Sequence, residues 1–149
     1  LTLPAEDRNV AYYGMGPGEK YSDFTSGAHM GLFGFDAHTA LQPYFNPQES
    51  GARTGVQAAA VTDAAGFGLC LAGNGFMLSA LPYTPHEVEN ARRQYELPPK
   101  VKTVVRCAKG QLGVAGDNTW GAGPHAEYHV ALEKGETFRF TFGGMGGNG

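Results

Sequence analysis

The sequence is poor in charge and has no long apolar run. Charged residues make up 17% of its 149 residues, against about 25% in average soluble proteins, and the formal net charge is -3. Binding to a phosphate backbone requires a surplus of lysine and arginine, so we expect no nucleic-acid partner. No stretch approaches the roughly 20 apolar residues that a membrane-spanning helix needs, so we expect no membrane partner.

The first ten residues lack both the basic region and the apolar stretch of a secretory signal peptide. They also lack an initiator methionine, so we interpret the chain as an excised part of a longer, cytoplasmic protein. Cysteine is scarce too. Cys70 and Cys107 both lie in apolar runs, which favours two buried thiols over a disulfide.

Glycine and proline, in contrast, are abundant. The 23 glycines and 9 prolines form about 21% of the chain, where about 12% is usual, and this disfavours a helical bundle. Aromatic residues reach 11% and the net charge is small, which disfavours disorder. We therefore expect a compact all-β domain.

Two hydrophobic patterns predict strands joined by short turns. Apolar and polar residues alternate over residues 101–108, 128–132 and 138–142, and continuous apolar runs occupy residues 56–62, 67–72 and 76–81. Residues 63–66 and 73–75 interrupt the continuous runs as turns. We predict an antiparallel β-sandwich over residues 1–142, followed by a frayed glycine-rich tail at residues 143–149.

One helix is expected between Thr84 and Tyr95. Thr84 is a favoured N-cap residue, Pro85 suits the first helical position, and Glu87 completes a capping box. Pro98 ends the pattern because proline cannot continue a helix. The sandwich should therefore carry a single short α-helix.

One glycine pattern and one histidine pattern resemble binding motifs, but neither predicts a binding site. Gly14, Gly16 and Gly18 are spaced as in a dinucleotide loop, but no amphipathic helix follows them, so we interpret them as a tight turn. His125 and His129 flank an expected strand, where four residues span about 13 Å, so they cannot share one metal ion. We expect no metal site.

Glycoside hydrolysis needs two carboxylic acids that face each other, and the sequence offers two local pairs. Glu19 with Asp23, and Glu87 with Glu89, are the local pairs. Glu87 is already explained as a capping residue, and Glu19 and Asp23 more simply hold their loop through backbone amides. No G-x-S-x-G nucleophile motif is present, so we assign no catalytic residue.

Trp120 is the only tryptophan and follows Asp117 and Asn118 in a polar, glycine-flanked loop. Sugars present apolar C–H faces that stack on aromatic rings, and their hydroxyls hydrogen-bond to Asp and Asn. The loop therefore suits a sugar-binding site formed by these three residues. The alternative is a ring tucked against one end of the sandwich, and the residues alone leave both interpretations open.

Five motifs, in the same order, resemble the C-terminal domain of the large β-galactosidases of glycoside hydrolase family 2. They are YGMGPGEKYSD at residues 13–23, PQESGAR at 47–53, SALPYTP at 79–85, YELP at 95–98 and GVAGDNTW at 113–120. Four positions depart from the family pattern, namely Met15, Phe24, Ser50 and Asn118. These departures suggest an altered network of ion pairs in the loops.

The resemblance implies a galactose-mutarotase-like super-sandwich, of which this chain would be about half. The family hydrolyses terminal β-galactosides such as lactose with retention, using two glutamates, magnesium and a monovalent cation in a central barrel. That barrel is absent here, so the resemblance implies no catalytic residue and no cofactor in this chain. The family's matching tryptophan stacks on the sugar, a role that carries over to Trp120.

Two functions therefore compete. The chain is either a non-catalytic portion of a β-galactosidase that contacts the remaining domains, or an independent carbohydrate-binding β-module. Dividing the sandwich would leave open strand edges and uncovered apolar surface, which favour association. We therefore expect the chain by itself to form a homodimer.

Overall fold

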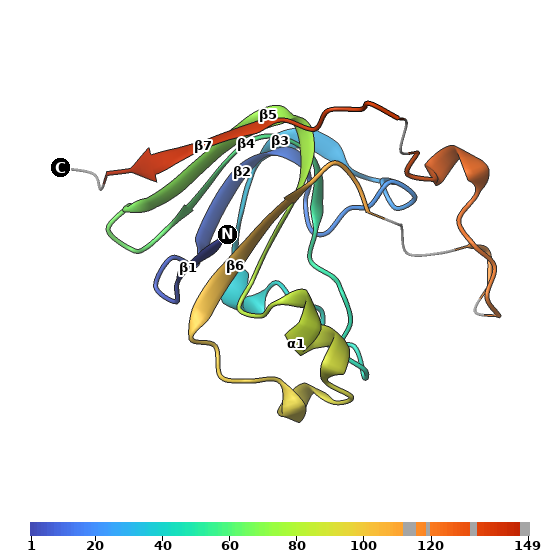
Figure 1. The fold of residues 1–149 in the computed structure, drawn as a ribbon, viewed down its shortest axis with the longest axis horizontal. Coiled ribbons are helices and arrows are strands. Elements are labelled where there is room, and N and C mark those ends of the chain that lie inside the picture. The colour runs from blue at the N-terminus through green and yellow to red at the C-terminus, as the bar shows by residue number, and fades with distance from the viewer. Residues whose placement is uncertain (112–115, 119, 132–133, 147–149) are drawn as a thin grey trace.

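The computed structural model describes residues 1–111, 116–118, 120–131 and 134–146. Seven antiparallel strands form one sheet in the order β1-β6-β5-β4-β2-β3, and β7 also pairs with β5. The strands are β1 (Thr2–Pro4), β2 (Asn9–Gly16), β3 (His29–Asp36), β4 (Arg53–Thr62), β5 (Gly68–Leu81), β6 (Lys102–Ala108) and β7 (Phe140–Met145). Figure 1 shows these strands with α1 (Pro85–Asn90), the single α-helix of the described residues, below them. The expected all-β fold with one short α-helix is confirmed.

Three short 3-10 helices complete the described elements: η1 (Ala37–Thr39), η2 (Gln94–Glu96) and η3 (Ala126–Tyr128). No helix in the part of the chain that the structure describes is long and apolar enough to cross a membrane.

The long strand β5 organises the sheet, because its two halves have different neighbours. Residues 68–73 pair with β7 and residues 77–81 pair with β6, while β4 lies along the other side. The register between β4 and β5 shifts around Val56, and Gly75 takes a positive φ of 73° at the same level. Such bulges bend a strand, and β6 and β7 run apart from each other along the two halves of β5 on either side of this bend (Figure 1). The turn expected at residues 73–75 is therefore wrong, since β5 bends there but continues.

The core lies on one face of this curled sheet. Its buried members come from β2, η1, β4, β5 and β6 and include Val10, Tyr12, Ala37, Val61, Leu71, Leu78 and Val105. Leu3 on β1 and Phe35 on β3 pack against the same core, although these are the two outermost strands of the path. The single sheet thus curls until its ends share one core, which produces the sandwich-like arrangement.

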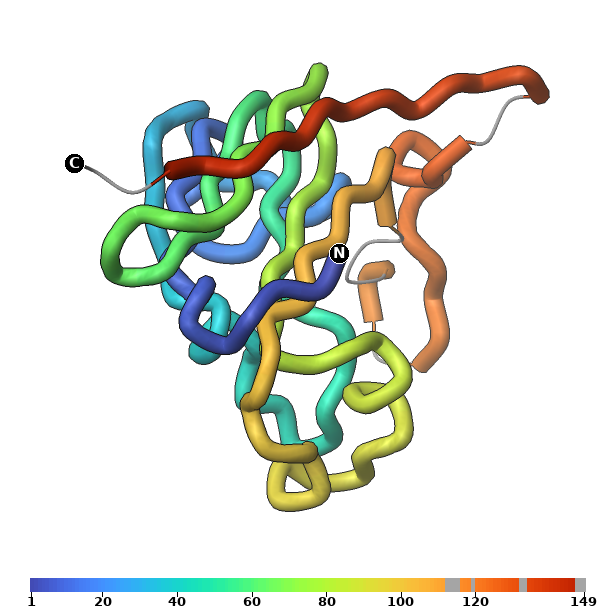
Figure 2. The backbone as a smooth tube through the Cα atoms, turned by 60° about the vertical axis from the view of Figure 1, so that its left-hand side comes forward, coloured from blue at the N-terminus to red at the C-terminus, as the bar shows by residue number. Residues whose placement is uncertain are grey.

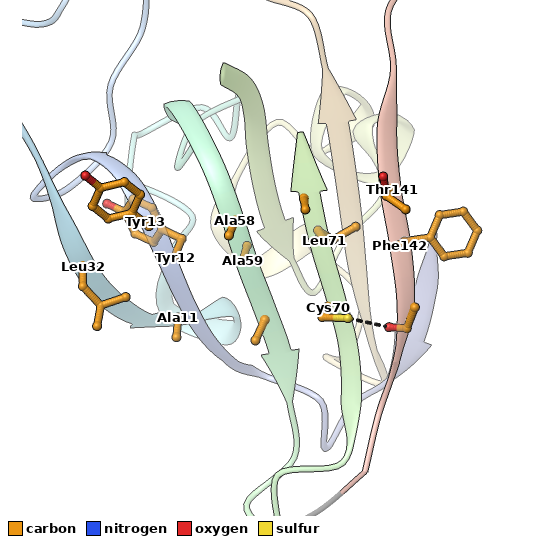
Figure 3. Close-up of a pocket in the computed structure, with 13 residues that line it drawn as sticks. Ala11, Tyr12, Tyr13, Leu32, Ala58, Ala59, Cys70, Leu71, Thr141 and Phe142 are labelled. Atoms are coloured by element: carbon orange, nitrogen blue, oxygen red, sulfur yellow. Dashed lines mark hydrogen bonds between the residues drawn. The ribbon is translucent and has the colours of Figure 1, made fainter. Parts of the chain in front are cut away.

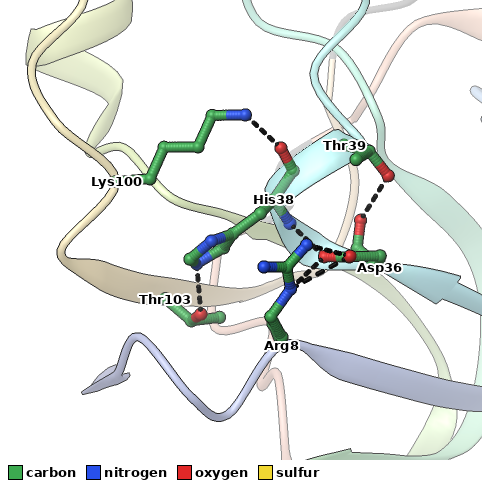
Figure 4. Close-up of polar contacts among 6 residues, drawn as sticks. All are labelled: Arg8, Asp36, His38, Thr39, Lys100 and Thr103. Atoms are coloured by element: carbon green, nitrogen blue, oxygen red, sulfur yellow. Dashed lines mark hydrogen bonds and ion pairs between the residues drawn. The ribbon is translucent and has the colours of Figure 1, made fainter.

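A polar corner at η1 joins the two ends of the sheet (Figure 4). The Asp36 carboxylate accepts a hydrogen bond from the backbone N–H of His38 at 2.8 Å and pairs with the Arg8 guanidinium. The His38 ring, 7% exposed, lies 3.2 Å from the Thr103 hydroxyl on β6. Desolvation, together with the nearby charge of Arg8, lowers the pKa of His38. The corner therefore holds a buried imidazole that favours its neutral form.

The helix is shorter than expected but begins as predicted. Thr84 Oγ1 accepts from the N–H of Glu87 at 3.3 Å, and Glu87 Oε2 accepts from the N–H of Thr84 at 2.6 Å, so the capping box is confirmed. Ala91 has an extended backbone, and the N–H of Arg92 donates to the Glu96 carboxylate at 2.7 Å. The Glu96 carboxylate thus takes the place of a helical carbonyl as the acceptor for the N–H of Arg92. The helix therefore ends at Asn90, and Tyr95 lies in η2.

The strand expected at residues 128–132 is wrong. Residues 126–128 form η3, residues 129–131 belong to no strand, and Leu132 lies outside the described residues. Side chains satisfy the backbone here, since the Ser22 hydroxyl donates to Tyr128 O and the Lys109 ammonium donates to Ala131 O. Alternation of residue types predicts a strand only where a neighbouring strand is available.

The last strand, β7, extends beyond the residues for which a strand is expected. β7 begins at Phe140 and runs through Met145, so it continues three residues into the tail expected to fray after residue 142. Its pairing with β5 orders Gly143 and Gly144, and residues 147–149 lie outside the described part.

Gly14 and Gly16 belong to β2 rather than to a turn, and only Gly18 of the three has a positive φ, 77°. Both cysteines are free thiols, as predicted, and half-buried.

Candidate functional site

The loop that carries Trp120 is closed at its base by a backbone hydrogen bond. The N–H of Gly116 donates to Ala122 O at 3.1 Å. A Cβ at position 116 would lie 2.7 Å from that same oxygen, so the close approach requires glycine. In Figure 2 this loop and η3, in orange, lie beside the sheet, and the chain then returns as β7 in red.

Trp120 projects from this loop into solvent. The residue is 93% exposed, and its backbone N–H donates to Asn118 Oδ1 at 2.8 Å. The sequence left open a ring tucked against the sandwich, and the structure shows instead an uncovered ring on a hydrogen-bonded loop. Asn118 shapes the loop through its oxygen and is itself exposed.

Asp117 has a partner that the sequence did not indicate. Its two carboxylate oxygens lie 3.1 and 3.0 Å from Nε2 of His125. The hydrogen bond to Asp117 raises the pKa of His125, so the pair is held most strongly when the ring is protonated. His125 also stacks on Tyr128, with ring centroids 6.4 Å apart. A separation of eight residues across a loop carries no periodic signal, so this contact could not be found from the sequence.

The two histidines weighed as metal ligands have separate partners. His125 pairs with Asp117, whereas Nε2 of His129 lies 3.0 Å from Pro124 O. Among the described residues, no group of three or more His, Cys, Asp or Glu side chains converges as a metal site would.

Two of the candidate carboxylates, Glu19 and Glu87, have structural partners. Glu19 Oε2 accepts from the N–H of Gly51 at 2.7 Å, which joins residues 13–23 to residues 47–53. Glu87 caps α1 and also pairs with Lys102 at 2.7 Å. Both interpretations of these side chains as structural groups are confirmed.

Two of the sequence motifs meet around the buried Arg53. The guanidinium lies 4.4 Å from the Phe35 ring centroid and donates to Gly51 O at 2.8 Å, and the residue is only 6% exposed. Desolvation lowers the pKa of Arg53, and burial raises the pKa of the nearby Tyr21 phenol. This buried polar unit positions the loops at one end of the sheet, and no spacing rule indicated its members.

The chain matches known proteins over nearly its whole length. The family model for the β-galactosidase small chain matches residues 1–143. β-Galactosidases from Halalkalibacterium halodurans, Streptococcus thermophilus and Lactobacillus delbrueckii subsp. bulgaricus are 39%, 36% and 37% identical to it over 94%, 95% and 95% of this chain. The chain therefore belongs to the β-galactosidase small-chain family. It spans 14% of the length of each of these relatives.

Proposed function

We propose that this chain is a non-catalytic part of a β-galactosidase and that Trp120 forms one wall of its sugar-binding cleft. The exposed indole on a hydrogen-bonded loop carries this proposal. An aromatic ring held away from its own core is free to stack on the apolar face of a sugar. Such contact contributes about 1 to 3 kcal/mol when the ring is desolvated.

The two polar neighbours complete the proposed contact with a sugar. Asn118 Oδ1 is engaged with the N–H of Trp120, which leaves the amide NH₂ to donate to a hydroxyl. The Asp117 carboxylate accepts from His125 and has further lone pairs for a sugar hydroxyl. Both side chains are exposed, so both can reach a bound ligand.

Catalysis is assigned to the rest of the protein. We infer that hydrolysis of terminal β-galactosides such as lactose uses glutamates, magnesium and a monovalent cation supplied by polypeptide outside this chain. The relatives' length supports this inference, since the chain spans 14% of it. The chain by itself should therefore not hydrolyse a chromogenic β-galactoside above the level of its Glu19→Gln variant.

The decisive experiment replaces Trp120 in the complete enzyme. Trp120→Ala should raise KM for lactose about ten- to a hundredfold, because each 1.4 kcal/mol of lost binding is tenfold. The turnover number should fall less, since bond cleavage occurs elsewhere. Trp120→Phe retains an aromatic face and should keep most of the affinity. A folded Trp120→Ala enzyme with unchanged KM would remove this residue from the sugar site.

The second candidate function is an independent carbohydrate-binding module, and the same exposed ring favours it. Trp120 is the only tryptophan beside seven tyrosines, so fluorescence of the isolated chain excited at wavelengths that tyrosine does not absorb reports on Trp120 alone. If the ring needs the opposite wall of a cleft, galactose and lactose should change this fluorescence only at millimolar concentrations or above. Micromolar binding by the isolated chain would favour the independent module.

A further inference from the structure

The hydrogen bonds inside the Trp120 loop fix its shape but not its direction. The N–H of Gly116 donates to Ala122 O, and the N–H of Trp120 donates to Asn118 Oδ1. Donor and acceptor belong to residues 116–122 in both cases, so these bonds would be kept if the whole loop turned about its two ends. The direction in which Trp120 projects therefore depends on a contact with another element.

His125 supplies such a contact from η3. It is the N-cap residue of η3, and its Nε2 lies 3.0 Å from Oδ2 of Asp117. Its ring stacks on the Tyr128 ring, with 26° between the ring planes and 6.4 Å between the centroids. The stacking limits the rotation of the imidazole while Asp117 engages its Nε2 edge. His125 thus joins the Trp120 loop to η3.

The segment that includes η3 is in turn attached to the sheet. The Ser22 hydroxyl, in the connection that follows β2, donates to Tyr128 O at 3.2 Å. The Lys109 ammonium, next to the end of β6, donates to Ala131 O at 3.0 Å. A continuous path of contacts therefore leads from two strands, through η3 and His125, to the carboxylate that precedes Trp120 in the loop.

We propose that His125 is a positioning residue, which through Asp117 holds the Trp120 loop in the direction that its contact with a sugar requires. The inference deepens the proposed function and rests on it, since it presupposes that Trp120 meets a sugar. His125 need not touch the ligand itself. It reduces the number of directions open to the loop before binding, and a preorganised ring loses less entropy when the sugar binds.

Acidic groups face the His125 ring from two elements. The hydrogen bond to Asp117 and the charge of that carboxylate raise the pKa of His125 above its ordinary value of 6.5, and the charge of Glu127 on η3 adds to the rise. Tyr128 is a third titratable neighbour, and Glu127 raises the pKa of its phenol as well. The surroundings of the ring therefore favour its cationic form.

Protonation strengthens the contact that holds the loop. Below the pKa of His125 a cationic ring pairs with the Asp117 carboxylate, whereas above it the ring is neutral and the contact is weaker. The loop should accordingly be held most firmly at low pH, and this contribution is lost as the pH rises through the pKa of His125. Both side chains are exposed, so the effect on sugar binding should be modest, about two- to fivefold.

Steady-state kinetics of the complete β-galactosidase with lactose test the proposal. His125→Ala removes the contact and should raise KM about two- to fivefold near pH 6, with kcat nearly unchanged. His125→Gln keeps an N–H donor for Asp117 but does not titrate. Its KM should match that of the unmodified enzyme near pH 8.5 and exceed it about twofold near pH 6. The same KM ratio at both pH values would overturn the role given to the charge.

His129→Gln is the matched control. His129 is also exposed and lies directly after η3, but its Nε2 is 3.0 Å from Pro124 O rather than near Asp117. This variant should keep the KM of the unmodified enzyme at both pH values. His125 is exposed as well, so the variants at both positions should fold.

Hydrogen–deuterium exchange followed by mass spectrometry supplies a readout that needs no sugar. In the complete enzyme near pH 6, amides in peptides that cover residues 116–122 should exchange about threefold faster in His125→Ala than in the unmodified enzyme. They should exchange at an unchanged rate in His129→Gln. Equal rates in all three proteins would overturn the proposal, because the loop would then be held without His125.

The two readouts separate this inference from the proposed function. Faster exchange together with a raised KM in His125→Ala supports the positioning role. Faster exchange with an unchanged KM would overturn it if Trp120→Ala raises KM, since the loop would then bind sugar equally well without His125. An unchanged KM in Trp120→Ala as well would refute the sugar contact and with it this role, whereas exchange would still show whether His125 holds the loop.

Discussion

At the scale of single residues, Arg53 shows how a charge is kept inside this fold. The guanidinium has no carboxylate contact among those found in the described residues. It lies over the Phe35 and Tyr12 rings and donates to two backbone carbonyls, Gly51 O and Ala52 O. Its role is therefore to join residues 47–53 to the core, through packing as much as through charge.

We expect Arg53→Ala to lower the free energy of unfolding by about 2 to 3 kcal/mol, because it removes ring contacts and the donor to Gly51 O, whereas Ala52 O keeps its hydrogen bond from the N–H of Lys20. Urea unfolding of the chain measures this loss. Arg93→Ala is the matched control, since Arg93 lies 4.2 Å from the centroid of the Phe45 ring at the surface and should cost about 0.5 kcal/mol or less.

Arg53→Met separates packing from charge. It keeps an apolar stem and removes a desolvated guanidinium, so it should cost less than Arg53→Ala. Equal losses in the two variants would show that the hydrogen bonds to the carbonyls, rather than the packing, hold the loop.

At the scale of elements, the η1 corner makes the joined ends of the sheet sensitive to pH. Burial lowers the pKa of His38 below its ordinary value of 6.5. Between the folded and unfolded pKa values, the unfolded state binds more protons, so the free energy of unfolding decreases as the pH falls below about 6.5.

We therefore expect the urea midpoint of the chain to fall between pH 7.5 and pH 5.5, and to fall less in His38→Gln. Glutamine can still hydrogen-bond to Thr103 but does not titrate. His86→Gln, at an exposed position on α1, is the control and should retain the pH dependence of the original chain. The same slope in all three proteins would assign the pH dependence to other groups.

At the scale of the whole molecule, no described residue covers the apolar outer face that includes Leu32, Tyr13 and Ala58 (Figure 3). Among the described strands, β3 and β1 each pair along one edge only. Both features favour association, because uncovered apolar area and unpaired backbone groups gain from a second surface. In the isolated chain only another copy can cover these surfaces.

We expect the isolated chain to self-associate, and sedimentation over a range of concentrations measures it. Ala58→Arg places a charge on the outer face and should shift the equilibrium toward monomer. Ala65→Arg makes the same change in an exposed turn and should leave the equilibrium unchanged. A monomer at all concentrations would show that the isolated chain keeps this face solvated.

The sequence by itself determined the features that depend on residues close together in the chain. The capping box at Thr84 needs only residues three apart, and the apolar runs in β4 and β5 are contiguous in the sequence, so both were predictable. The five ordered motifs determined the family, since each is a short contiguous string. The continuous apolar runs indicated that β4 and β5 are buried on both faces, whereas the described residues of this chain cover one face only.

Only the tertiary structure decided which distant residues meet. It joined β5 into one bent strand, paired Asp117 with His125, and placed the Arg53 guanidinium over the Phe35 ring. It also replaced the expected strand at 128–132 with η3. It also showed Trp120 to be exposed, where the sequence left two interpretations open. Periodicity describes which side of an element a residue occupies, whereas the neighbour on that side depends on how the whole chain packs.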